Sequence, residues 1–88
     1  MYNLELKESV EKLFHKIAKK NRSEMDIIDK KIAQILENPY HFKPLKKPMA
    51  HKRRVHVVGS MVLVYSIDEA AKTVVIQDYD HHDNVYKT

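Results

Sequence analysis

The chain has 88 residues, a formal net charge of +4 and 43% hydrophobic residues, which is too apolar a composition for a disordered protein. The absence of cysteine excludes a disulfide framework and thiolate zinc sites, and it fits a reducing cytoplasm. The single glycine, Gly59, excludes glycine-rich phosphate loops, and no apolar run approaches the roughly 18 residues of a membrane helix. No signal-peptide segment follows Met1, so we expect one cytoplasmic domain spanning residues 1–88.

The first twenty residues predict a short strand followed by a helix. Residues 2–6 alternate polar and apolar side chains, with Leu4 and Leu6 on one face of a strand. From Ser9, which is a suitable N-cap, apolar residues recur at helical spacing as far as Lys20.

A second helix follows a break at residues 21–22. Its apolar stripe runs from Met25 to Leu36, and Ser23 with Asp26 resembles a capping box. A link this short predicts an antiparallel helical hairpin whose two stripes lie on a shared apolar surface.

The second half of the chain predicts strands. Three prolines mark residues 39–50 as an extended loop that Leu45 and Met49 anchor to the core. Strands are expected at 54–58, 61–67 and 73–79, and the middle strand is apolar enough to be covered on both faces. The predicted fold class is α+β, with a helical hairpin on one face of an antiparallel sheet in the order β-α-α-β-β-β.

The positive charge is concentrated in residues 43–56, which contain no acidic residue. Such a cluster suits a polyanion, because each cation that neutralises a phosphate releases a counterion. In the strand that ends this segment, Arg54 and His56 face away from Val55. The alternative interpretation is a solvated loop without a ligand. The cations of the segment are Lys43, Lys46, Lys47, Lys52, Arg53 and Arg54.

Three pieces in register carry a family resemblance. Residues 43–45 (Lys-Pro-Leu) look like a His-Pro-Leu motif, and residues 53–56 with 62–65 look like an R-x-x-H strand followed by x-L-[IV]-Y. Residues 82–86 (His-Asp-Asn-Val-Tyr) look like a closing His-x-x-Leu-Phe or H-R-x-x-V-Y motif. Together they resemble the RelE/ParE superfamily of type II toxins, and most closely its YafQ-type branch of mRNA interferases.

The resemblance implies a metal-independent endoribonuclease that cuts mRNA in the ribosomal A site without a cofactor and is silenced by a RelB- or DinJ-like antitoxin. Carried over by position, His56 and His82 are the acid/base histidines, and Tyr86 is the aromatic residue near the scissile phosphate. Lys43 and Arg54 are expected on the phosphate, because cations stabilise the charge that develops there. The remaining predicted RNA-binding residues are Lys46, Lys47, Lys52, Arg53 and His81.

Two positions depart from the family pattern. Ser60-Met61 stands where the branch often has Asp-Trp, and Val62 stands where RelE itself has an arginine. Two alternative functions therefore stay open: a ParE-like inhibitor of DNA gyrase, and a relative that binds RNA without cutting it. A separate alternative is that His81 and His82 are tail residues without a role. A metal site formed by His81 and His82 with His41, His51 or Asp83 fits no ligand spacing that we know.

Overall fold

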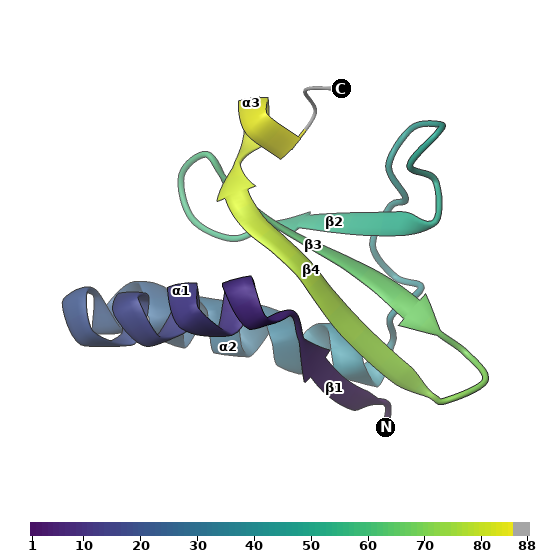
Figure 1. Ribbon diagram of the computed structural model, residues 1–88, viewed down its shortest axis with the longest axis horizontal. Helices are drawn as coiled ribbons and strands as arrows, with labels where there is room; N and C mark the ends of the chain where they lie inside the picture. The colour runs from purple at the N-terminus through teal and green to yellow at the C-terminus, as the bar shows by residue number, and fades with distance from the viewer. Residues whose placement is uncertain (86–88) are drawn as a thin grey trace.

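The computed structural model describes residues 1–85 and places two helices against one side of a sheet (Figure 1). The predicted helical hairpin on one sheet face is confirmed, and the predicted element order gains a short C-terminal helix. In chain order the elements are β1 (Asn3–Leu6), α1 (Glu8–Lys20), α2 (Arg22–Glu37), β2 (Lys52–His56), β3 (Met61–Asp68), β4 (Thr73–His81) and α3 (His82–Val85).

The strands lie in the order β1-β4-β3-β2. As predicted, β2, β3 and β4 pair antiparallel, because short turns connect them. The N-terminal strand β1 pairs in parallel with β4, from Asn3 beside Thr73 to Leu6 beside Ile76. The sheet is therefore mixed, which corrects the expectation of an antiparallel sheet. The rule for short links does not extend to β1, because both long helices separate it from the other strands.

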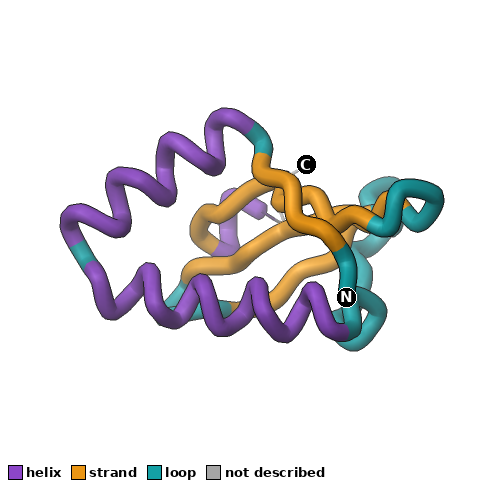
Figure 2. Tube along the Cα trace, turned by 90° about the horizontal axis from the view of Figure 1, so that it is seen from below, coloured by secondary structure: helices purple, strands orange, loops and turns teal. Residues whose placement is uncertain are grey.

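The helices diverge from their junction at Asn21 and lie across the sheet (Figure 2). Their buried stripes meet the inward residues of three strands, and Phe14 contacts Tyr79 edge to face with ring centroids 5.8 Å apart. None of the described helices is long and apolar enough to cross a membrane. The buried residues of this main core are Val10, Phe14, Met25, Ile28, Ile32, Ile35, Val55, Leu63, Tyr65, Val74, Ile76 and Tyr79.

Each predicted helix cap lies two residues after the observed one. Lys7 occupies the N-cap position of α1 and makes no side-chain capping bond. Because the helix begins at Glu8, Ser9 lies inside its first turn. Asn21 caps α2: its Oδ1 accepts from the backbone N–H of Glu24 at 3.1 Å and from the hydroxyl of Ser23 at 2.8 Å. Ser23 therefore supports the cap instead of forming it.

Strand β3 is buried on both faces, as predicted. Leu63 and Tyr65 join the main core, whereas Val62 and Val64 face a smaller cluster on the opposite side of the sheet. Leu45, Met49 and Val85 complete this cluster, so the loop before β2 and the helix α3 both pack on the face that the helical hairpin leaves open. The predicted anchors of the loop, Leu45 and Met49, are thereby confirmed.

Candidate active site

A hollow of about 530 Å³ lies on the sheet face opposite the helical hairpin. The loop before β2, strand β2 and helix α3 enclose it, three segments that are well separated in sequence. We term it the histidine hollow. Its lining residues are Leu45, Lys46, Lys47, Met49, Arg54, His56 and His82.

The two histidines predicted as acid and base lie together in this hollow. Their rings are stacked, with centroids 5.6 Å apart and an interplanar angle of 21°. His56 ends β2, and His82 begins α3, where its backbone N–H donates to the carbonyl of Ser60 at 2.7 Å. The turn between β2 and β3 therefore helps to hold both rings on one side of the sheet, within reach of one phosphodiester.

Asp80 positions the start of α3. Its Oδ1 accepts from the side-chain amide of Asn84 at 3.1 Å and from the backbone N–H of His81 at 2.7 Å. These hydrogen bonds lower the pKa of the Asp80 carboxyl, so the group stays ionised. Sequence reasoning missed this residue. The signal was present, because an aspartate just before a helix commonly bonds local backbone N–H groups.

Arg54 connects the loop before β2, which we term the basic loop, to the histidine hollow. Its Nη1 and its backbone N–H both donate to the carbonyl of Lys43, at 3.3 and 3.2 Å. Lys46 and Lys47 are exposed at the hollow, so three cations face the two imidazoles. The Lys43 side chain lines an adjoining hollow of about 280 Å³, which shares Arg54 and His56 with the histidine hollow.

Arg53 has a different environment from its neighbour Arg54. It pairs across the sheet with Tyr65, whose ring lies in the main core, so it faces the helical side. Its Nη1 donates to the carbonyls of Phe42 at 2.6 Å and Tyr40 at 3.4 Å, and its guanidinium lies 5.1 Å from the centre of the Tyr40 ring. These contacts assign Arg53 to holding the loop, away from the histidine hollow.

His81 and Lys52 also lie outside this hollow. His81 pairs with Met61, which packs against the main core, and its Nδ1 lies 2.8 Å from the hydroxyl of Ser60. Lys52 lines a separate hollow farther along the same sheet face. Tyr86 lies outside the described residues, so its predicted role stays a prediction.

That separate hollow, termed the Asp78 hollow, has a volume of about 310 Å³. It shares Leu45 and Met49 with the histidine hollow, so the two lie side by side on the sheet. Its lining residues are Lys7, Leu45, Met49, Lys52, Val64, Gln77, Asp78, Asn84 and Val85.

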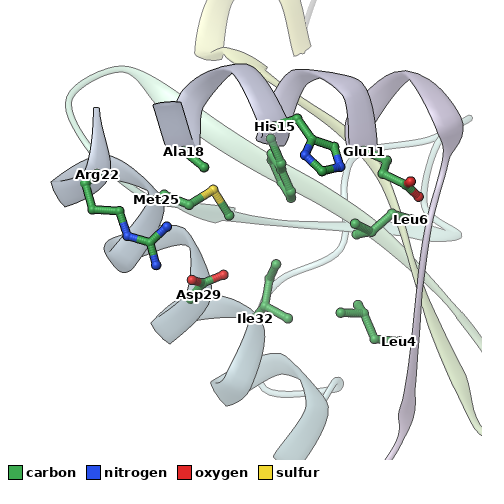
Figure 3. A pocket seen from close by; sticks show the side chains of 10 residues that line it. Leu4, Leu6, Glu11, His15, Ala18, Arg22, Met25, Asp29 and Ile32 are labelled. Carbon is green, nitrogen blue, oxygen red and sulfur yellow. The ribbon is translucent and has the colours of Figure 1, made fainter. Parts of the chain in front are cut away.

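A groove of about 340 Å³ opens on the other side of the molecule, between the two long helices and β1 (Figure 3). Within the described chain, its lining includes none of the predicted site residues, and no group of three metal-binding side chains occurs in residues 1–85. The groove residues are Leu4, Leu6, Glu11, Phe14, His15, Ala18, Arg22, Met25, Asp29 and Ile32.

An exposed polar cluster surrounds Glu69 in the turn between β3 and β4. Its carboxylate accepts from Lys72, from the Tyr40 hydroxyl at 2.5 Å and from the Tyr2 hydroxyl at 2.9 Å. These bonds lower the pKa of Glu69 to about 2. The cluster ties the N-terminus and the residue after Pro39 to the β3–β4 turn, and it contains no predicted site residue.

Comparison with known proteins identifies the family. Residues 2–86 match the family model described as the ParE toxin of type II toxin–antitoxin system, parDE. A protein of Methanocaldococcus jannaschii named "Putative toxin RelE4" is 42% identical over 87 residues, covering 99% of this chain and 93% of that protein. An uncharacterized protein of Methanosarcina mazei is 48% identical over 86 residues, covering 98% of this chain and all of that protein.

Solved structures show the same fold. The YoeB/ParE toxin from Agrobacterium tumefaciens superposes with a TM-score of 0.80 at 15% identity, over 91% of this chain and 98% of that one. A chain of the toxin–antitoxin complex RelBE2 from Mycobacterium tuberculosis superposes with a TM-score of 0.72 at 25% identity, over 91% and 90% of the two chains. This protein therefore belongs to the ParE/RelE family and is a toxin of the type II toxin–antitoxin class.

Proposed function

We propose that this toxin is a YafQ-like mRNA interferase, a single-domain cytoplasmic endoribonuclease that cuts mRNA in the ribosomal A site. The observation that carries the proposal is the stacked pair His56 and His82, which shares one hollow with Arg54. Two imidazoles and a guanidinium around one hollow supply the groups that RNA cleavage requires.

The proposed reaction uses the 2′-hydroxyl of the substrate as nucleophile. One imidazole takes the hydroxyl proton while the 2′-oxygen forms a bond to phosphorus, and the bond from phosphorus to the 5′-oxygen breaks. The second imidazole protonates the leaving 5′-oxygen, so the products are a 2′,3′-cyclic phosphate and a 5′-hydroxyl. Each proton transfer contributes about 10²- to 10⁴-fold in rate. The assignment of base and acid between His56 and His82 is left open.

The cations have a separate role in this scheme. The phosphorane carries more negative charge than the starting phosphodiester, and preorganised donors stabilise it without reorganisation. Arg54 is suited to this role because two hydrogen bonds to the Lys43 carbonyl fix it beside His56. Lys46 and Lys47 would bind the phosphates that flank the cleaved one. Lys43 would bind the RNA where it enters the adjoining hollow.

An antitoxin is the proposed protein partner. The Mycobacterium tuberculosis structure of similar fold is a toxin–antitoxin complex, which supports a partner of this class. The basic loop would attract an acidic segment, and disordered acidic segments commonly fold on such surfaces. A RelB- or DinJ-like antitoxin that covers the histidine hollow would block access of RNA to both imidazoles.

A ParE-like inhibitor of DNA gyrase is the second candidate function, because the matching family model is described as a ParE toxin. Primer extension on reporter mRNA after brief induction separates the two functions. The interferase predicts discrete cuts inside translated codons, whereas the gyrase inhibitor predicts a DNA-damage response with intact mRNA.

We expect His82→Ala to abolish these cuts, because the site then lacks one of its two proton-transfer groups. The matched control is His15→Ala, which removes an exposed imidazole from the helical side and should leave cleavage unchanged. Full cleavage by a folded His82→Ala protein would refute the assignment of this site.

A further inference from the structure

The Asp78 hollow has the size and position of a subsite next to the histidine hollow. Its volume of about 310 Å³ is at the lower end of small-molecule pockets and suits one planar heterocycle. Leu45 and Met49 line both hollows, so a strand whose phosphate lies at the histidines can place a neighbouring base here.

The surfaces of this hollow combine apolar and polar groups. Leu45, Val64 and Val85 belong to the buried cluster on this sheet face and form the floor of the hollow. The partly buried Met49 offers an apolar contact to the face of a base. Lys7 and Lys52 contribute two ammonium groups against the single carboxylate of Asp78, so the lining does not repel a polyanion. Unpaired bases of RNA are recognised by this combination of apolar contact and edge hydrogen bonding.

Asp78 supplies the group that can distinguish one base from another. Its Oδ1 accepts from the backbone N–H of Tyr79 at 2.9 Å, and a carboxylate has about four acceptor positions in total. The side chain is exposed, so its oxygens can accept further bonds from a ligand. Gln77 donates its amide to Ser66 at 2.8 Å, which leaves its carbonyl oxygen as a second acceptor.

We propose that the Asp78 hollow binds a guanine base of the RNA strand next to the scissile phosphate. Guanine presents two adjacent donors, N1–H and the N2 amino group, on its Watson–Crick edge, and these match the two oxygens of one carboxylate. Adenine, cytosine and uracil each present fewer donors there and cannot form this two-bond pair. The proposal rests on the proposed nuclease function, because it treats RNA as the substrate.

Nucleotide binding tests this proposal without requiring cleavage. The protein is titrated with GMP, AMP, CMP and UMP while the backbone amide resonances are followed by NMR. We expect GMP to bind about tenfold or more tightly than the others, the discrimination typical of a good two-bond base contact. The shifts should centre on the amides of Gln77, Asp78 and Lys52.

Two variants identify the group responsible. Asp78→Asn replaces one of the two acceptors with a donor, so the preference for GMP should be lost. Asp29→Asn makes the same change on an exposed residue beside the helical groove and should retain the preference. Equal binding of all four nucleotides, a preference that survives in Asp78→Asn, or shifts centred on the helical groove would each overturn the proposal.

Mapping of cleavage sites then separates this inference from the proposed function. If the wild-type protein cuts mRNA, Asp78→Asn should still cut but should lose enrichment of guanine beside the cut, whereas His82→Ala should not cut. An unchanged cut pattern in Asp78→Asn refutes the guanine subsite and leaves the nuclease intact. GMP preference in a protein that makes no cuts refutes the nuclease and leaves the base-binding hollow.

Discussion

The salt dependence of RNA binding reports how many cations contact phosphates. Four of the six cations in residues 43–56 line the histidine hollow or the hollow that adjoins it, namely Lys43, Lys46, Lys47 and Arg54. Arg53 faces the opposite side of the sheet and holds backbone carbonyls, and Lys52 lies in the Asp78 hollow.

Four phosphate contacts to single-stranded RNA predict a slope of log affinity against log salt of about −2.8, compared with about −4.2 for all six cations. Between about 50 and about 200 mM salt, the affinity should then fall about 50-fold, whereas six contacts predict a fall of about 300-fold. The difference is large enough to measure by fluorescence anisotropy of a labelled oligonucleotide. The His82→Ala protein prevents cutting during the titration.

Variants connect the slope to particular residues. Replacing both Lys46 and Lys47 with Gln should make the slope less steep by about 1.4. Lys30→Gln removes an exposed cation from α2 and should leave the slope unchanged. A slope near zero would mean that the basic loop is only solvated, and a slope near −4.2 would refute the structural role assigned to Arg53.

Three further predictions concern stability and the support of the site. Tyr65→Phe should cost about 1–2 kcal/mol in urea unfolding, because the buried hydroxyl donates to the Pro39 carbonyl at 2.6 Å, and an unchanged urea midpoint would contradict this reasoning. Val85→Ala should cost about 1–2 kcal/mol and should lower cleavage further than the exposed Val58→Ala does, because Val85 holds α3 and therefore His82. Glu69 has a folded-state pKa lowered to about 2 from 4.5, so its contribution to stability is present above pH 4.5 and is lost as the pH falls towards 2. The melting temperatures of wild type and Glu69→Gln should differ most above about pH 5 and converge near pH 2, and a difference independent of pH would exclude this carboxylate as the cause.

Periodicity in the sequence is sufficient to predict most of the fold, because each long element has one buried face. The stripe through Val10 and Phe14 predicts α1, and the apolar run from Met61 predicts a strand covered on both sides. The parallel pairing of β1 with β4 is not predictable in this way, since alternation indicates which side chains share a face and says nothing about the neighbouring strand. Helix α3 is too short to show a helical period.

The candidate site shows the same limits. Strand alternation places Arg54 and His56 on one face, and the same rule places Arg53 on the other face with Val55. Treating the basic residues as one continuous run therefore overestimated the number that face the hollow. The approach of His82 to His56 depends on Ser60, whose carbonyl accepts from the backbone N–H of His82, and only the folded chain brings these residues together.

The two consecutive arginines grip the loop before β2 from opposite sides of the sheet. Arg53 binds the carbonyl of Phe42 from one side, and Arg54 binds the carbonyl of Lys43 from the other. These hydrogen bonds hold the loop against the sheet, so the positive charges of the loop are in place before a polyanion binds. A phosphate that reaches the histidine hollow therefore meets cations that the fold has already placed there.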